Sequence, residues 1–347
     1  MEDMRQRSGC LARRDVSGVS EILGVTMLLA MVVTVLGAVF VVLTPLVNDI
    51  NDNREWSAGS VAATQLNDRI LVVADSPAGT GVVHRSAQLA NSIDWLPGAE
   101  TWTIAADMAG TDRVTVRLDP GGVNVTSLNR TASNMTVVTE TGTYQSDLVN
   151  GTGNLSVGGV TDGRVSVEVK DMQGNTIHRL VRISIDGIRL NNYMTSGVFT
   201  VDLVNGARIE KLPGQGIVVQ EYPRLRHDVL IDGTPRVSLV LLDIEAGEAT
   251  TQHMNTVNLA SLGAESLFDG PSRNLLLKTV FVAEATIGAR YTHHWAGDHD
   301  LWLASGQIDD YNGFGPRQRL SGLDGLTLFP TDETFTLEVT LQKVEVS

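Results

Sequence analysis

The chain of 347 residues has almost no cysteine. Its single cysteine, Cys10, lies before a long apolar segment. The residues after that segment therefore contain no disulfide, thiolate metal site or cysteine nucleophile. In lipoproteins the acylated cysteine follows the hydrophobic segment, so we do not expect Cys10 to carry a lipid anchor.

Lysine is the second scarce residue, and acidic residues dominate the charge. Asp and Glu number 40 against 26 Lys and Arg, giving a formal net charge of −14. Binding to nucleic acid needs clustered cations against phosphate, so this balance argues against a nucleic-acid partner. The composition resembles that of proteins from salt-loving archaea, where concentrated salt screens the repulsion between like charges. Lysine occurs at only four positions: Lys170, Lys211, Lys278 and Lys343.

Catalytic signatures are also missing. The sequence contains no G-x-S-x-G elbow, no H-E-x-x-H motif and no G-x-x-x-x-G-K-[ST] loop. We therefore expect a protein that is not an enzyme and needs no cofactor.

One cluster near the C-terminal end contains imidazoles and carboxylates, which suit a divalent metal. Its spacing matches no zinc motif, and the adjacent histidines would point to opposite faces of a strand. We expect a polar loop here, with an anchored metal-dependent hydrolase as the third functional hypothesis. The weak metal candidates are His293, His294, Asp298, His299 and Asp300.

The most informative segment is an uncharged run of 23 residues, Ile22 to Thr44. As a helix it would be roughly 35 Å long, enough to cross a hydrocarbon core of about 30 Å. Four arginines precede it, and basic flanks stay on the cytoplasmic side of a membrane. The sequence therefore predicts an N-in/C-out transmembrane helix at residues 19–45, with the remainder outside the cell.

An ordinary secretory signal has a shorter apolar region that ends in small residues at its cleavage site. This run is longer and ends Val-Val-Leu-Thr-Pro. The order of features before it is a basic leader, a small residue, Val-Ser and then the helix. That order resembles the amino-terminal segment of archaeal type IV pilins and pilin-like proteins, over about residues 13–45. The residues that carry the resemblance are Arg13, Arg14, Asp15, Val16, Ser17, Gly18, Val19, Ser20 and Glu21.

The resemblance implies a class III signal peptide and a prepilin peptidase as partner. It places the cut between Gly18 and Val19, so that residues 1–18 are a leader. Glu21 would become the third mature residue. A carboxylate there suits the positive end of the helix dipole. By resemblance to pilins it would also pair with the terminal amine of a neighbouring subunit.

Beyond the apolar run, apolar residues continue at helical spacing with polar residues between them. We predict an amphipathic stalk helix at residues 46–77, after a kink or break at Pro45, and ending at Ser76-Pro77.

From residue 78 onward, short alternating runs are bounded by turn residues, which is typical of an extracellular β domain. The fold class is therefore α+β, with a long N-terminal helix followed by a mainly β, sandwich-like ectodomain. One large sandwich or two lobes divided near residues 188–210 would both suit the length. Residues 245–270 look like a long connection with a short helix. The strands are expected at residues 101–105, 113–118, 135–139, 164–170, 178–185, 198–203, 217–220, 237–244 and 334–346.

Turn dipeptides at four places predict hairpins. They are the run at 119–122 and the pairs at 186–187, 205–206 and 232–233.

Five N-x-S/T sequons fall close together, and none has proline in the middle. If this region faces the exterior they are N-glycosylation acceptors, and glycans would coat one exposed face of the domain. A Thr- and Asn-rich region with turn chemistry alone is the alternative. The acceptors are Asn124, Asn129, Asn134, Asn150 and Asn154.

Three hypotheses follow. The first is a pilin-like structural or surface protein, either held in the cell membrane or polymerised with other pilin subunits into a surface filament. It would serve as a minor filament subunit or an adhesion component. The second is an uncleaved, signal-anchored surface β protein that binds a ligand or cell-wall glycan. The metal-dependent hydrolase is the third.

Overall fold

The computed structural model describes residues 17–86, 90–108, 114–119, 121–160, 163–247, 256–281, 291, 319–320, 325–328 and 334–347. One long helix is followed by a mostly β domain, so the predicted α+β class is confirmed. The chain divides into two compact units, residues 1–54 and residues 55–347. The boundary between them lies inside the helix.

Helix α1 runs from Ser17 to Ala74, 58 residues in all. In the first unit its apolar side chains are exposed around the whole circumference, as for Met31 at 72% and Val42 at 73%. An 18-residue window within it has a mean hydropathy of 2.7 and no buried residue. By length and composition this part of α1 can cross a membrane.

Of the kink or break expected at Pro45, the break is wrong, because α1 continues through Pro45. Proline lacks a backbone N–H and so removes one hydrogen bond of the helix. The helix continues because the backbone hydrogen bonds before and after Pro45 remain. Thr44 adds a bond of its own, since its Oγ1 donates to the carbonyl of Phe40 at 2.7 Å. Hydroxyl groups of this kind commonly support proline in apolar helices.

In the second unit α1 becomes one-sided. Leu66, Ile70 and Val73 follow one another at spacings of four and three residues, and all three are buried. Gly59 lies where the helix approaches the sheet, since a Cβ there would be 2.7 Å from Nδ2 of Asn192. The helix ends at Ala74, close to the predicted stop.

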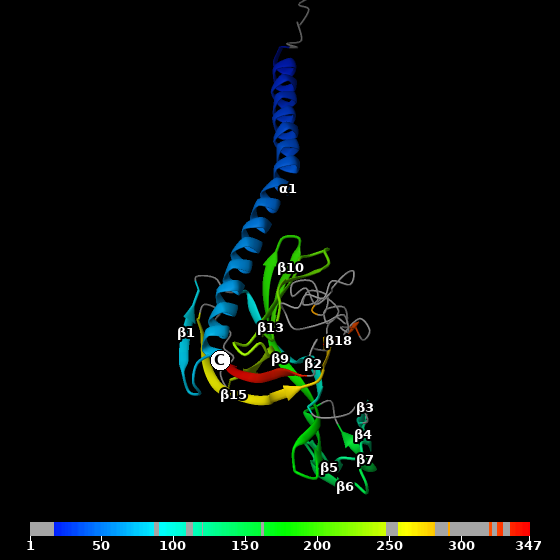
Figure 1. The fold of residues 1–347 in the computed structure, drawn as a ribbon. Coiled ribbons are helices and arrows are strands. Elements are labelled where there is room, and N and C mark those ends of the chain that lie inside the picture. The colour runs from blue at the N-terminus through cyan, green and yellow to red at the C-terminus, as the bar shows by residue number, and fades with distance from the viewer. Residues whose placement is uncertain are drawn as a thin grey trace, which may run out of the picture. The chain divides into compact units, whose positions relative to one another are not determined.

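The strands form three sheets in the described part of the chain. The five-stranded sheet has the order β1-β15-β19-β14-β13, and β14 with β19 is its parallel pair. Its strands are β1 (Gly81–Arg85), β13 (Arg224–Val229), β14 (Pro235–Ala246), β15 (Thr256–Ser272) and β19 (Phe335–Val346). In Figure 1 the second half of α1 lies beside β1 and β15.

The eleven-stranded sheet has the main order β12-β11-β10-β9-β2-β16-β18-β17, with β8, β5 and β6 continuing beyond β9. Residues 188–210 belong to β9, β10 and β11 of this sheet. Its strands are β2 (Ser92–Asp107), β5 (Ala132–Thr139), β6 (Gly142–Asp147), β8 (Val165–Asp171), β9 (Thr176–Met194), β10 (Gly197–Val204), β11 (Ala207–Lys211), β12 (Ile217–Glu221), β16 (Leu275–Phe281), β17 (Arg319–Leu320) and β18 (Gly325–Leu328).

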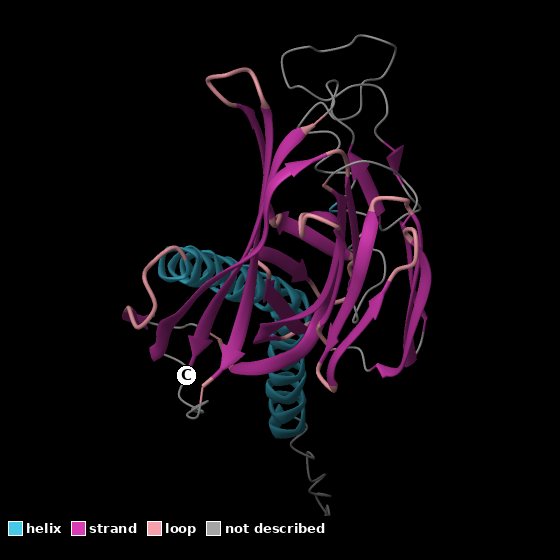
Figure 2. Ribbon diagram, turned by 60° about the horizontal axis from the view of Figure 1, so that its bottom comes forward, coloured by secondary structure: helices cyan, strands magenta, loops and turns pink. Residues whose placement is uncertain are grey.

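The third sheet is small, with the order β3-β4-β7. Its strands are β3 (Val114–Asp119), β4 (Gly121–Leu128) and β7 (Thr152–Val160). Strands make up most of the described part of the second unit, as Figure 2 shows.

Three apolar clusters hold these layers together. The first joins the five- and eleven-stranded sheets, for example Leu239 and Val339 with Trp102 and Ile183. The second packs α1 on both sheets, and the third joins the small sheet to β5 and β8. Each fully buried apolar side chain of this size contributes about 1.5–3 kcal/mol. The packing of two sheets face to face makes the domain sandwich-like.

The predicted strands all overlap observed ones, but residues 245–270 were misjudged as a connection with a short helix. Strand β15 occupies Thr256–Ser272 and pairs with the C-terminal strand β19. The register shifts between Ser261 and Gly263 and again between Ser266 and Phe268. Each bulge shifts the alternation of inward and outward side chains by one residue. The sequence of β15 therefore lacks the regular apolar–polar alternation by which a strand is recognised.

The hairpin predicted at Asp186-Gly187 is also wrong, because both residues lie inside β9. A Cβ on Gly187 would be 2.5 Å from Cγ2 of Val204 on the neighbouring strand. The glycine therefore marks a close approach of two strands rather than a turn. The other three predicted turns do fall at hairpins: residues 119–122 where β3 meets β4, 205–206 between β10 and β11, and 232–233 between β13 and β14.

Candidate functional site

The predicted processing site lies at the start of α1. The helix begins at Ser17, so the Gly18–Val19 bond falls in its first turn. The first N–H groups of a helix have no partner within it, which makes this turn the easiest part to open. Glu21 follows on the same helix with an exposed side chain.

The five sequons are gathered around strands β4, β5 and β7. Asn150 and Asn154 are exposed, and Asn150 takes the left-handed conformation with φ of 53°. Asn124 and Asn134 are half-buried within strands. Asn154 on β7 lies beside β4, the strand that carries Asn124, since Thr126 Oγ1 of β4 donates to Asn154 Oδ1 at 3.4 Å.

Asn129 differs from the other four because it is buried, with 3% exposure. Its Oδ1 accepts bonds from the backbone N of Thr131 at 3.0 Å and from Thr131 Oγ1 at 2.8 Å. Its side chain thus holds a tight turn. A glycan on the buried Nδ2 would require this turn to open, so Asn150 and Asn154 are the best-placed acceptors in the folded domain.

The weak metal candidates, His293 to Asp300, lie outside the described residues. So does the leader up to residue 16, including Cys10.

A pocket that was not predicted lies on the eleven-stranded sheet, on the face opposite α1. Its floor consists of two rows of residues that lie opposite one another on neighbouring strands. One row contains Arg189, Asp202 and Ile209, and the next contains Thr200, Lys211 and Ile217. Directly opposed residues of neighbouring strands have Cβ atoms about 4.5–5.5 Å apart. Alternation along β10 sends Phe199 and Val201 to the other face, into the cluster beneath α1.

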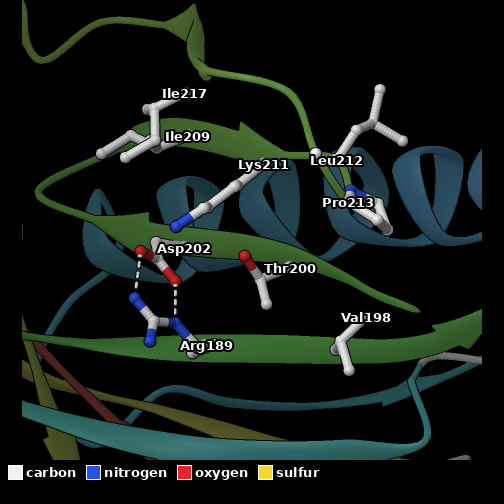
Figure 3. Close-up of a pocket in the computed structure, with 10 residues that line it drawn as sticks. Arg189, Val198, Thr200, Asp202, Ile209, Lys211, Leu212, Pro213 and Ile217 are labelled. Atoms are coloured by element: carbon white, nitrogen blue, oxygen red, sulfur yellow. Dashed lines mark hydrogen bonds and ion pairs between the residues drawn. The ribbon is translucent and has the colours of Figure 1, made fainter. Parts of the chain in front are cut away.

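The polar centre of the pocket is an ion pair between Arg189 and Asp202. Nε of Arg189 donates to Oδ1 at 2.6 Å and Nη2 donates to Oδ2 at 2.8 Å, the two-pronged geometry drawn in Figure 3. The Asp202 side chain is 10% exposed. The hydrogen bond to Asp202 raises the pKa of Arg189, and the nearby Asp94 acts in the same direction.

Lys211 lines the same pocket without a partner in the described part of the chain. It lies opposite Thr200 in the register. Figure 3 shows its side chain leaving β11 on the side of the sheet that carries Asp202 and Arg189. The pocket lining thus holds two cations and one carboxylate.

The walls of the pocket are apolar and come largely from the β11–β12 turn. Leu212 and Pro213 lie on one side and Ile217 on another. The turn is closed by a bond from Gln215 N to the carbonyl of Leu212 at 3.1 Å. It stands close to the β9–β10 turn, because a Cβ on Gly197 would be 3.1 Å from Pro213 Cβ. The enclosed volume is about 360 Å³.

Sequence reasoning missed this pocket because its residues meet only through strand register. Arg189, Asp202 and Lys211 come from three strands and form no motif along the chain. One available signal was the rarity of lysine, since Lys211 is one of only four.

The opposite face of the same strands carries charges that are all paired. Arg208 bonds to the carboxylates of Glu210 and, at 3.0 Å, Glu221. Ser60 of α1 donates to Glu210 at 2.8 Å, and Asn67 of α1 donates to Glu221 at 2.6 Å. This closed network attaches the helix to the sheet and leaves no cation for a ligand.

A second buried carboxylate lies in the core between the sheets. Glu100 is 1% exposed and accepts bonds from Trp102 Nε1 and from the Tyr291 hydroxyl, each at 2.7 Å. Burial raises the pKa of Glu100 to about 7, although both hydrogen bonds act in the opposite direction. Glu100 thus joins Trp102 and Tyr291 in the core between the sheets.

No protein-family model, no curated protein and no solved structure matches the chain.

Proposed function

We propose that the chain is a pilin-like structural or surface protein, trimmed by a prepilin peptidase after Gly18. It is inserted N-in/C-out and acts as a minor filament subunit or a surface adhesion component. The observation that carries the proposal is the contrast along α1. Its first part exposes apolar side chains on every side, and its second part is buried against the β domain.

The exposed part of α1 needs an apolar environment. Soluble monomers rarely expose contiguous apolar patches of more than a few hundred square ångströms. A helix that is apolar all round is covered by a bilayer or by other helices. The proposal supplies both in turn, first the membrane and then the helices of neighbouring subunits.

The start of α1 supports processing. Removal of residues 1–18 leaves the apolar helix complete from Val19 onward. Glu21 then lies in the first turn, where a carboxylate is favoured by roughly 0.3–1 kcal/mol. It is the proposed partner of the terminal amine of an adjacent subunit.

The exposed sequons support display outside the cell. Asn150 and Asn154 lie on the small sheet and its turns, where a glycan would extend into solvent. The proposal involves no enzymatic step and no cofactor.

A Gly18→Trp variant tests the processing step, with Gly24→Trp as the control. Both add the same side chain to α1, and a Cβ on Gly24 meets nothing within 4 Å. We expect Gly18→Trp to accumulate as the longer precursor on a denaturing gel, and Gly24→Trp to be trimmed like the wild type. Equal mobility and equal surface display of all three proteins would instead favour the uncleaved, signal-anchored surface protein.

A further inference from the structure

We propose that the pocket on strands β9–β12 binds a sugar that bears one carboxylate, of the hexuronate class. The argument rests on the pocket residues alone and does not depend on processing or polymerisation.

The size of the pocket fits a small ligand. Its volume of about 360 Å³ lies at the lower end of the range of about 300–1,000 Å³ that is common for small-molecule sites. Its apolar walls, Ile217, Leu212 and Pro213, suit the C–H face of a sugar ring. The floor carries the polar groups, as in most such sites.

The charge of the pocket fits a single carboxylate. Lys211 has no partner in the described part of the chain, and Nη1 of Arg189 makes no hydrogen bond there either. A ligand carboxylate at Lys211 would accept a charge-assisted hydrogen bond from its ammonium group, because Asp202 lies between Lys211 and Arg189 and is already bound to Arg189. Asp202 stands next to these cations, and Asp94 lies beyond Arg189. These two acids oppose a multiply charged anion such as phosphate.

The remaining polar groups fit hydroxyls. Thr200 lies opposite Lys211 on the floor, two residues before Asp202 on β10, and its hydroxyl can both donate and accept. Each oxygen of Asp202 accepts one bond from Arg189 and keeps a second lone pair for a ligand hydroxyl. A carboxylate at one end and hydroxyls at the other is the pattern of a uronic acid.

Titration of the full-length protein in detergent micelles tests this assignment. The probes are D-glucuronate, an oligoglucuronate, D-glucose and inorganic phosphate. Isothermal titration calorimetry measures the binding of each. We expect saturable binding of glucuronate, free or within the oligomer, with glucose and phosphate at least about tenfold weaker, because each lacks one half of the pattern. The oligomer arm shows whether the source is a free sugar or a polysaccharide. Added salt should weaken glucuronate binding, since the attraction is partly ionic.

Two variants locate the site. Lys211→Gln should weaken glucuronate binding by roughly tenfold to a hundredfold, the effect of losing one charge-assisted hydrogen bond. Lys170→Gln is the matched control, because Lys170 is a strand lysine outside the pocket that pairs with Glu168 at 3.1 Å. An unchanged thermal midpoint in both variants confirms that they fold. The proposal is overturned if neither acidic probe binds, if glucose or phosphate binds as tightly, or if Lys211→Gln behaves like its control.

Discussion

Val33 and Leu66 lie on the same helix in opposite surroundings. Val33 is 61% exposed in the first unit, and Leu66 is fully buried in the second. Around Val33 no residue is charged and nearly all are apolar, whereas around Leu66 the buried apolar residues form one stripe. The difference shows that one continuous helix has two kinds of surface. An all-round apolar surface suits lipid or a helix bundle, and a stripe suits a folded domain.

The largest expected effect comes from placing charge in the first part of α1. The double variant Val33→Arg with Leu36→Arg should lose membrane association, because each arginine near the centre of a span costs about 2.5–3.5 kcal/mol. Fractionation by ultracentrifugation after an alkaline wash measures how much of each variant remains in the membrane. The apolar swap Val33→Leu with Leu36→Val is the control and should remain in the membrane. If the arginine variant stays there equally, the first part of α1 does not span a bilayer.

A truncation in the second part of α1 should affect the β domain instead. Leu66→Ala removes a fully buried side chain and should lower the free energy of unfolding by about 2–5 kcal/mol. Val61→Ala, on the exposed side of the same helix, should change it by less than about 0.5 kcal/mol. Denaturant unfolding followed by tryptophan fluorescence compares the two. Equal losses would mean that α1 does not pack on the sheets as described.

The first part of α1 and the β domain should also differ in how they respond to pH. No titratable side chain lies between Ile22 and Thr44, so membrane association should not change between pH 5 and 8. The β domain should respond through Glu100, whose pKa rises from 4.5 to about 7 on folding. Between these values the unfolded chain loses the proton while the folded one retains it. The free energy of unfolding therefore falls as the pH rises, by about 3 kcal/mol in total for this group.

Denaturant unfolding at several pH values measures that slope. Glu100→Gln removes the titrating group and should flatten this part of the pH dependence. Glu338→Gln, whose side chain is 39% exposed, is the control and should keep the wild-type slope. A Glu100→Gln slope identical to that of the control would contradict the assignment.

Much of this fold could be read from the sequence because the strongest patterns are local. The helix was predicted to end at 77 and ends at Ala74, and the long alternation of residues 334–346 is strand β19. Strand β15 was not predicted because its two bulges interrupt the alternation, and neither the break considered at Pro45 nor the turn predicted at Gly187 occurs. At Gly187 the pairing with neighbouring strands outweighed the local turn preference, whereas at Pro45 the hydrogen bonds of the helix on either side were sufficient.

The candidate sites differ in the same way, according to whether their residues are close together in the sequence. Gly18, Val19 and Glu21 are recognisable because they lie within four residues of one another in the chain. The pocket is not, since Arg189, Asp202 and Lys211 are brought together only by the register of three strands. Among the sequons, burial separates Asn129 from the exposed Asn150 and Asn154, which no count of motifs could do.

The most direct test of the proposed function is the N-terminus of the protein isolated from the membrane of the cells that make it. Mass spectrometry of the N-terminal peptide should find a chain that begins at Val19, with no peptide from residues 1–18. A chain that retains the peptide containing Cys10 would contradict processing by a prepilin peptidase.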